Sequence, residues 1–260
     1  MRRLLAAGLA VLTLAAAAAT PAWAQQAPAG ASTPVPSGKP DPFGEQVRAY
    51  LLAHPEVIME AVQLLQERKQ LAEAEAQKQA ITIRADEIFR DPASPVGGNG
   101  AGDVTLVEFF DYNCKYCKAV APTVADLRSA DPALRLVYKE FPILGLGSVA
   151  AAKVALAAHR QGNYQKFHEQ LMNHASPVDE AVAMQAAAAV GLDLDRLKRD
   201  MADPAIAEAI ARNQALAAAL GINGTPGFVL ADQVVPGAVD RATLEGLIAR
   251  ARGKNAGASP

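Results

Sequence analysis

Two cysteines, Cys114 and Cys117, are the only ones in the 260-residue chain, and two residues separate them. A disulfide across so short a loop removes little conformational entropy from the unfolded chain, so it would be a poor structural staple for a protein of this length. The pair follows an apolar, β-prone run at residues 105–110 and precedes a helical pattern at residues 118–128. The free amides and positive dipole end at the start of a helix stabilise a thiolate. We therefore expect thiol–disulfide chemistry, with Cys114 as the nucleophile and Cys117 as the resolving thiol.

A metal site is the alternative use of this pair. One Cys-x-x-Cys motif can supply half of a zinc site or bind a copper ion, but zinc would usually need two further ligands. The sequence contains no second motif of this kind and no closely spaced pair of histidines. The formal net charge of −2 gives no reason to expect a nucleic-acid partner. We therefore favour redox chemistry that uses neither a metal nor an organic cofactor.

The N-terminus has the pattern of a secretory signal peptide. Arg2 and Arg3 precede an apolar run at residues 4–19, and an Ala-Trp-Ala sequence ends at Ala24. A membrane anchor is the alternative, but the run is shorter than the ~20 residues that a spanning helix needs, and Pro21 interrupts its end. We expect export, cleavage near Ala24 and no membrane insertion of the mature protein.

A helical arm is expected after a linker rich in Pro, Ala, Ser and Gly. Pro55 is placed to begin its long helix, because proline is tolerated in the first turn. Ile58, Val62 and Leu65 follow at helical spacing and form one apolar stripe. Water is an unfavourable environment for such a stripe, so we expect arms of several copies to associate through it. The alternative is that the C-terminal part of the same chain covers it.

The remaining sequence predicts an α/β architecture. A second strand is expected at residues 134–141, a helical block at about 145–220, a hairpin around Ala231-Asp232 and a closing helix at 241–252. This order predicts a thioredoxin-like core with a helical insertion. The expected parts are a signal peptide (1–24), a flexible linker (25–42), the helical arm (43–90), a Gly-rich linker (91–103), the thioredoxin-like domain (104–253) and a flexible tail (254–260).

Three further positions could join the cysteines. Glu108 lies inside the first strand, where a buried carboxyl could take and return the Cys117 proton. Lys139 in the second strand could pair with Glu108, although both could also be ordinary surface charges. Thr225-Pro226 precedes the hairpin, and its peptide bond could be cis or could belong to a plain turn.

Three segments resemble the DsbA-like family of bacterial periplasmic oxidoreductases. They are Phe-Phe-Asp-Tyr-Asn-Cys-Lys-Tyr-Cys-Lys at 109–118, Tyr-Lys-Glu-Phe-Pro-Ile-Leu-Gly at 138–145, and Gly-Ile-Asn-Gly-Thr-Pro at 221–226. The helical arm resembles that of a subgroup, the suppressor-of-copper-sensitivity C (ScsC) and Com1-like proteins. The resemblance implies a periplasmic location, an active site formed by Cys114, Cys117 and a cis-proline at Pro226, a buried proton carrier at Glu108, and an arm that serves as an oligomerisation stalk. It also implies exported proteins as clients and a membrane redox partner similar to DsbD or ScsB.

Two departures from the family pattern bear on the type of activity. The dipeptide between the cysteines is Lys115-Tyr116 and not the Pro-His of the strong oxidant DsbA. Tyrosine in this dipeptide and Thr225 before the proline resemble the disulfide isomerases DsbC and DsbG. The resemblance therefore favours isomerase or reductase activity. A dedicated oxidase and a copper-binding or chaperone protein of the copper-stress response remain the alternatives.

Overall fold

The computed structural model describes residues 41–257. The expected signal peptide at 1–24, nearly all of the expected linker at 25–42, and residues 258–260 lie outside the described residues. The chain divides into two units, one ending at Ala61 and the other beginning at Val62. Across residues 41–257, no helix has the length and apolar character needed to cross a membrane.

The arm consists of two helices separated at a proline. Helix α1 (Pro42–Ala53) begins after Asp41, whose side chain accepts a hydrogen bond from the Phe43 amide at 3.2 Å. Helix α2 (Glu56–Ile83) starts directly after Pro55, close to the expected position. A proline lacks an amide donor and disfavours the helical conformation of the residue before it, so α1 ends at Ala53 and a new helix starts beyond Pro55.

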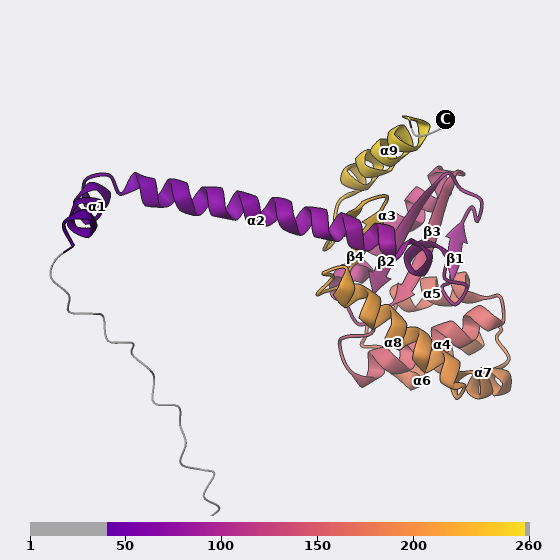
Figure 1. Ribbon diagram of the computed structural model, residues 1–260. Helices are drawn as coiled ribbons and strands as arrows, with labels where there is room; N and C mark the ends of the chain where they lie inside the picture. The colour runs from indigo at the N-terminus through magenta and orange to yellow at the C-terminus, as the bar shows by residue number, and fades with distance from the viewer. Residues whose placement is uncertain (1–40, 258–260) are drawn as a thin grey trace, which may run out of the picture. The chain divides into compact units, whose positions relative to one another are not determined.

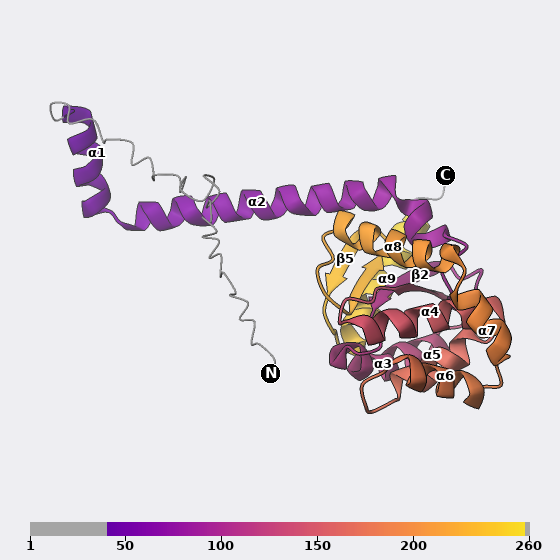
Figure 2. The same cartoon turned by 90° about the horizontal axis from the view of Figure 1, so that it is seen from below.

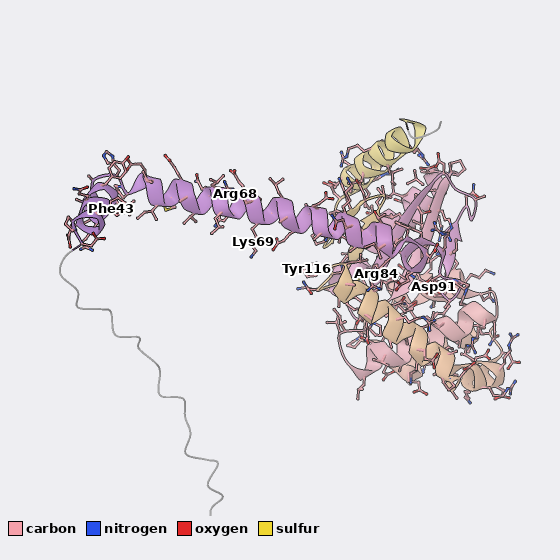
Figure 3. All side chains as sticks on the ribbon, viewed as in Figure 1. Phe43, Arg68, Lys69, Arg84, Asp91 and Tyr116 are labelled. Atoms are coloured by element: carbon pink, nitrogen blue, oxygen red, sulfur yellow. The ribbon has the colours of Figure 1, made fainter. Side chains whose placement is uncertain are left out.

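The apolar stripe of the arm is exposed in the single chain. Ile58, Val62 and Leu65 retain 50%, 41% and 68% of their accessible surface. Figure 3 draws the side chains along α2, including the labelled Arg68 and Lys69. The only buried residue of α2 is Ile81, close to its C-terminal end.

The end of the arm belongs to the core of the second unit. Ile81 and Ile88 are buried in the same apolar cluster, and Ile88 lies in a short π-helix, η2 (Asp86–Arg90). The Gln77 side chain donates a hydrogen bond to the carbonyl of Leu220 at 3.0 Å. The expected arm at 43–90 is thus corrected at its C-terminal end, because its last turns pack against the domain that follows.

The structure also corrects the expected Gly-rich linker at 91–103, because part of this segment is a strand of the sheet. Residues Val96–Gly98 form strand β1, which pairs antiparallel with strand β3 (Leu134–Glu140). Gly98 has a φ of +67°, and a Cβ added there would lie 2.5 Å from the Leu134 carbonyl oxygen. A Cβ on Gly102 would lie 2.4 Å from the carbonyl oxygen of Ala133. These glycines permit close backbone packing at the edge of a sheet and do not provide a flexible hinge.

Five strands form one mixed sheet in the order β1-β3-β2-β4-β5 (Figure 1). Strand β2 (Val104–Phe110) runs parallel to β3 and antiparallel to β4 (Gly227–Leu230), which forms a hairpin with β5 (Gln233–Pro236). Helices α3 (Lys115–Ala130) and α9 (Arg241–Gly257) contribute to the apolar core on one face of the sheet. The end of α8 (Pro204–Ala219), η2 and the end of α2 contribute to the core on the other face.

The helical insertion lies between β3 and β4, as expected. It comprises α4 (Leu146–Arg160), α5 (Tyr164–Met172), α6 (Glu180–Ala189), α7 (Leu194–Met201) and α8 (Figure 2). Small residues such as Ala151, Ala155 and Ala158 are fully buried on α4, which allows neighbouring helices to approach closely. At the C-terminus, α9 continues to Gly257, so the expected flexible tail at 254–260 begins as helix.

Replacing Gly102 by alanine should destabilise the second unit. The new Cβ would meet backbone atoms of Ala133 and Arg135, which cannot rotate away as a side chain can. We expect a loss of ~1–3 kcal/mol in the free energy of unfolding, measured by chemical denaturation. Gly100→Ala is the matched control, because open space surrounds its Cβ position. Equal stability of the two variants would contradict the packing role of Gly102.

Candidate active site

The two cysteines lie where β2 passes into α3. Cys114 is the N-cap residue of α3, and its Sγ accepts a hydrogen bond from the Cys117 amide at 3.4 Å. Its own amide donates to the carbonyl of Asp111 at 3.0 Å. Both residues are free thiols in this structure; Cys114 is 5% exposed and Cys117 is fully buried. Cys114 is therefore both nearer to the free amides of α3 and nearer to solvent.

The Thr225-Pro226 peptide bond is cis and lies against Cys114. The Cys114 thiol donates a hydrogen bond to the Thr225 carbonyl at 3.2 Å, across 111 positions of sequence. The bond stands immediately before β4, which pairs with β2. Pairing of β2 with β4 thus brings together two sequence motifs that are far apart in the chain.

Glu108 occupies a buried position on β2 behind the cysteine pair. It is 4% exposed, and its Oε1 has no hydrogen-bond partner within the described part of the chain. Burial raises the pKa of Glu108 to about 8. Burial also raises the pKa of the Cys117 thiol, and the charge of Glu108 acts in the same direction. A carboxyl and a thiol that both disfavour the charged form are suited to exchanging a single proton.

Lys139 is not the partner of Glu108. Alternate residues of a strand point to opposite faces, and the register pairs Glu108 with Tyr138 and Lys139 with Phe109. The fully buried Lys139 Nζ donates to Ser94 Oγ at 2.7 Å and to the Glu87 carbonyl at 2.6 Å, and it pairs with Asp91 at 3.4 Å. Both expectations for Lys139 are therefore corrected: it is not a surface charge, and it anchors η2 and the segment before β1.

Asp111, which the sequence analysis did not single out, holds the turn before the cysteines. Its Oδ1 accepts from the Asn113 amide at 2.7 Å. Its Oδ2 accepts from the amides of Ile143 and Leu144 at 2.8 and 2.9 Å. One buried carboxylate thus ties the cysteine turn to the loop that follows β3. An Asp directly after a strand, with another polar residue two positions later, is typical of a turn held by the Asp side chain. This sequence pattern could have indicated the role of Asp111.

Asn113 ties the same turn to the helical insertion. Its Nδ2 donates to Ser148 Oγ at 3.0 Å and to the Val178 carbonyl at 2.9 Å, and its Oδ1 accepts from the Val178 amide at 2.7 Å. All three of these side-chain hydrogen bonds join Asn113 to residues of the helical insertion. The insertion therefore helps to fix the position of Cys114, the next residue in the chain.

A buried polar cluster lies beneath the turn. Glu140 accepts hydrogen bonds from Tyr112 at 3.1 Å and from Tyr164 at 2.8 Å, and the Tyr112 hydroxyl also lies 3.2 Å from Nδ1 of His168. Burial lowers the pKa of His168 to about 3, so the imidazole is neutral at physiological pH. Satisfied networks of this kind rigidify the surrounding core. Among residues 41–257, no group of three or more His, Cys, Asp or Glu side chains is arranged to hold a metal ion.

Comparison with known proteins places this geometry in a family. The model of the DSBA-like thioredoxin domain matches residues 105–249, which is more than half of the chain. The chain belongs to the DSBA-like thioredoxin domain family. A second model, the copper resistance protein ScsC N-terminal domain, matches residues 41–72 in the arm. This family consists of thiol–disulfide oxidoreductases. The predicted fold class, a thioredoxin-like fold with a helical insertion and an N-terminal helical arm, is confirmed.

Solved structures with similarity over most of the DsbA-like domain or beyond it include the following two. A thioredoxin-like oxidoreductase from Silicibacter pomeroyi is 50% identical, with a TM-score of 0.63 over 65% of this chain and 97% of that chain. ScsC of Proteus mirabilis, in a transitional conformation, is 29% identical, with a TM-score of 0.63 over 82% of this chain and 96% of that chain. The second similarity extends across more of the chain than the first.

Curated relatives contain the same region within longer proteins. The Na(+)/H(+) antiporter NhaA 3 of Salinispora tropica is 33% identical over 135 residues, or 51% of this chain and 21% of that protein. The chain therefore spans about a fifth of the length of this relative. Antiport is an activity of that protein and is not attributed to this chain.

Replacing Glu108 by glutamine should remove a pH dependence of stability. The folded pKa of about 8 lies above the ordinary value of 4.5, so the folded state holds the Glu108 proton over this window and stability is lost as pH rises through it. The stability of Glu108→Gln relative to the wild type should therefore increase by up to ~1.4 kcal/mol per pH unit across the window and level off above it. Urea unfolding at a series of pH values measures this difference. A constant difference over the same range would contradict the burial argument.

Proposed function

We propose that this protein is a periplasmic thiol:disulfide oxidoreductase that isomerises or reduces disulfides of exported proteins. The observation that carries the proposal is the position of Cys114: its sulfur caps α3, hydrogen-bonds to the Thr225 carbonyl beside Pro226, and stands one helical turn before Cys117. The expected signal peptide, cleaved near Ala24, supports the periplasmic location.

The proposed reaction has two exchange steps. The Cys114 thiolate attacks one sulfur of a client disulfide, a mixed disulfide forms, and the other client sulfur leaves as a thiolate. Cys117 then gives its proton to Glu108 in its ionised form, which is the minor form near neutral pH because burial raises the pKa of Glu108 to about 8. Cys117 attacks the Cys114 sulfur in the same step. A Cys114–Cys117 disulfide forms, and the second client sulfur leaves as a thiolate. In isomerisation, a different client thiolate attacks the client sulfur of the mixed disulfide first. A new client disulfide forms, Cys114 leaves as a thiolate, and Cys117 remains a thiol throughout.

The surface around the cysteines supports a client with exposed apolar side chains. Tyr116 is exposed beside Cys114 and is labelled in Figure 3. Ile143, Leu144 and Leu146 are exposed in the loop that Asp111 holds and at the start of α4. Exposed apolar patches of this kind mark interaction sites. Misfolded exported proteins present complementary apolar segments.

The dipeptide between the cysteines supports the choice of isomerase or reductase over oxidase. Lys115 Nζ lies 4.9 Å from the centre of the Tyr116 ring, a cation–π arrangement. The dipeptide thus provides a cation that is partly engaged by the ring and no histidine. Such a protein would need a supply of electrons, and we propose a membrane reductase similar to DsbD or ScsB as its redox partner.

We further propose that the protein self-associates through its arm. The support is the exposed stripe of Ile58, Val62 and Leu65 together with the match of residues 41–72 to the ScsC N-terminal domain. Association would remove the stripe from water, and burial of each such side chain is worth ~1.5–3 kcal/mol. An assembly would also present several Cys114 thiols to one client, which suits repeated attack on wrong disulfides.

The two cysteines should give different phenotypes. Cys114→Ser should abolish refolding of scrambled ribonuclease, because no nucleophile remains. Cys117→Ser should accumulate mixed disulfides with the substrate, because the resolving thiol is missing; non-reducing gel electrophoresis detects them. Full activity of Cys114→Ser would contradict the redox proposal.

A charge placed on the stripe should separate isomerase activity from simple exchange. Val62→Glu should produce a monomer by light scattering that still reduces insulin but refolds scrambled ribonuclease poorly. Gln63→Glu introduces the same charge one position along α2, away from the stripe, and should leave the assembly intact. A wild-type protein that is monomeric at micromolar concentration would contradict the stalk proposal.

Copper binding is the second candidate function. The description of the N-terminal family model as a copper resistance protein domain favours it. A thiolate pair at Cys114 and Cys117 could bind Cu(I), which prefers soft sulfur ligands. Redox titration of the pair, next to a Cu(I)-binding assay on the reduced protein, separates the candidates. Tight Cu(I) binding without exchange activity would favour this second function.

A further inference from the structure

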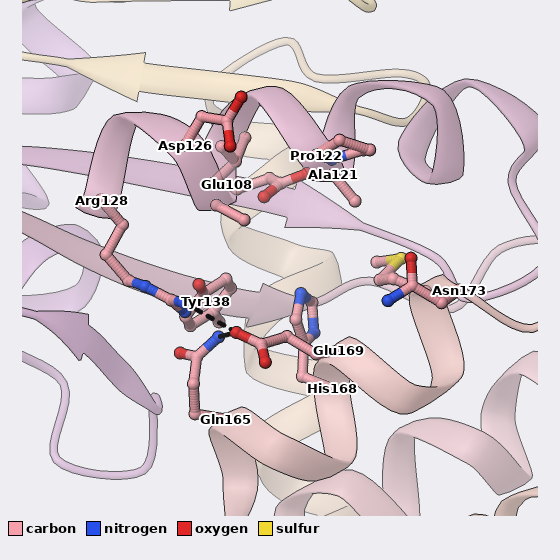
Figure 4. Close-up of a pocket in the computed structure, with 13 residues that line it drawn as sticks. Glu108, Ala121, Pro122, Asp126, Arg128, Tyr138, Gln165, His168, Glu169 and Asn173 are labelled. Atoms are coloured by element: carbon pink, nitrogen blue, oxygen red, sulfur yellow. Dashed lines mark hydrogen bonds and ion pairs between the residues drawn. The ribbon is translucent and has the colours of Figure 1, made fainter. Parts of the chain in front are cut away.

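The loop at residues 173–179 joins α5 to α6 and lies beside the helix that carries the cysteines. Its first residue, Asn173, is labelled at the end of α5 in Figure 4. Asn173 lines a cavity of about 360 Å³ next to Glu108, which residues of α3 and α5 line together. The residues at the centre of the loop, 175–177, are exposed. The loop therefore borders α3 along its length and faces solvent at its centre.

Lys118, the residue after Cys117, holds the centre of this loop on α3. Its Nζ donates hydrogen bonds to the His174 carbonyl at 2.6 Å and to the Ser176 carbonyl at 3.3 Å. Among residues 41–257, no other side chain hydrogen-bonds to the backbone at 174–176. An exposed segment with so few anchors opens easily when one of them is removed. The conformation of the loop centre therefore depends on this one ammonium group.

Asp111 holds a second loop through the opposite charge. Its carboxylate accepts hydrogen bonds from the amides of Ile143 and Leu144, whereas the Lys118 ammonium donates to two carbonyls of the 173–179 loop. Burial lowers the pKa of Lys118, and the charge of Asp111 opposes that shift, so the two groups are near enough to interact. A pair of opposite charges beside the cysteines thus fixes the two loops that border them.

The two loops adjoin and form one surface. A Cβ on Gly147, at the start of α4, would lie 2.6 Å from the Val178 carbonyl oxygen, so the backbones of α4 and the 173–179 loop are in close contact. Leu146, the residue before Gly147, is 88% exposed. The exposed apolar side chains at 143–146 therefore border a loop whose centre carries only small side chains. Such a surface fits an extended client segment with an apolar side chain next to its cysteine.

We propose that Lys118 is a positioning residue that holds the 173–179 loop as one wall of the client-binding surface. The inference rests on the proposed function and names the surface that the client occupies. The client segment lies with an apolar side chain on the exposed residues at 143–146 and with its backbone along the loop. A wall that is already fixed loses less conformational entropy when the client binds. Loss of the Lys118 ammonium therefore weakens client binding more than it slows thiol exchange.

Reaction of the reduced full-length protein with two disulfides tests this assignment. One is a peptide disulfide with an apolar residue beside its cysteine, and the other is hydroxyethyl disulfide, which is too small to reach the loop. Lys118→Met keeps the side-chain length and removes the donors. It should raise the half-saturation concentration of the peptide about fivefold or more, with the limiting rate within about twofold of the wild type. Lys118→Arg, which keeps charge and donors, should restore peptide binding.

The small disulfide separates binding from reactivity. An effect of the lost charge on Cys114 would appear equally with both disulfides, whereas loss of the wall should appear mainly with the peptide. Lys166→Met is the matched control, because it removes the same charge from an exposed position of α5 and leaves the loop hydrogen bonds intact. It should leave the half-saturation concentration of the peptide unchanged.

A variant within the loop tests the same wall without altering α3. Pro177 is exposed, and glycine there widens the range of backbone conformations. Pro177→Gly should raise the half-saturation concentration of the peptide, and the double variant with Lys118→Met should show less than the product of the two effects, because both act through one loop.

Equal losses with both disulfides in Lys118→Met, or wild-type peptide binding in both Lys118→Met and Pro177→Gly, would overturn the role of Lys118. If circular dichroism shows that Lys118→Met does not fold, peptide binding by Pro177→Gly decides the question: weaker binding supports the wall, and wild-type binding overturns it. A wild-type protein that reduces neither disulfide would instead overturn the proposed function, since no exchange reaction would remain for the loop to serve.

Discussion

The chemistry of this protein depends on a single junction, the point where strand β2 ends and helix α3 begins. The junction places the Cys114 sulfur on the first free amides of a helix, which favour a thiolate, and it places Cys117 one turn further into the core. A turn this short would be mobile by itself. Asp111 and Asn113 hold it by hydrogen bonds to the loop after β3 and to the helical insertion.

Strand alternation divides the buried charges of the sheet between two tasks. Glu108 and Glu140 share one face with the cysteine turn, where burial keeps protons bound and Tyr112 and Tyr164 satisfy the second carboxyl. Lys139 points to the other face and binds Asp91, Ser94 and the Glu87 carbonyl, so its charge fastens the end of the arm to the sheet. A displacement of one residue in the β2–β3 register would move the Glu108 side chain to the face on which Lys139 lies.

The arm has an exposed apolar part and a buried apolar part. Its first helical stretch keeps an apolar stripe in water, whereas Ile81 and Ile88 are core residues of the second unit. The unit that carries the cysteines therefore begins structurally within α2, well before the glycines at 97–102 that resemble a boundary in the sequence. This arrangement leaves the proposed association surface and the redox site on separate parts of the chain.

Local pattern in the sequence determined the strand–cysteine–helix order, the helical insertion, the break at Pro55 and the family, because each depends on neighbouring residues or on contiguous motifs. The same pattern could not show that Gly98 and Gly102 pack against backbone, since glycine permits both flexibility and close approach. Nor could it assign Lys139 a partner or give Asp111 and Asn113 their roles, because those contacts join residues 32 to 65 positions apart. Only the tertiary structure decided which side chains face the Glu108 cavity, since that depends on how α5 of the insertion packs beside α3.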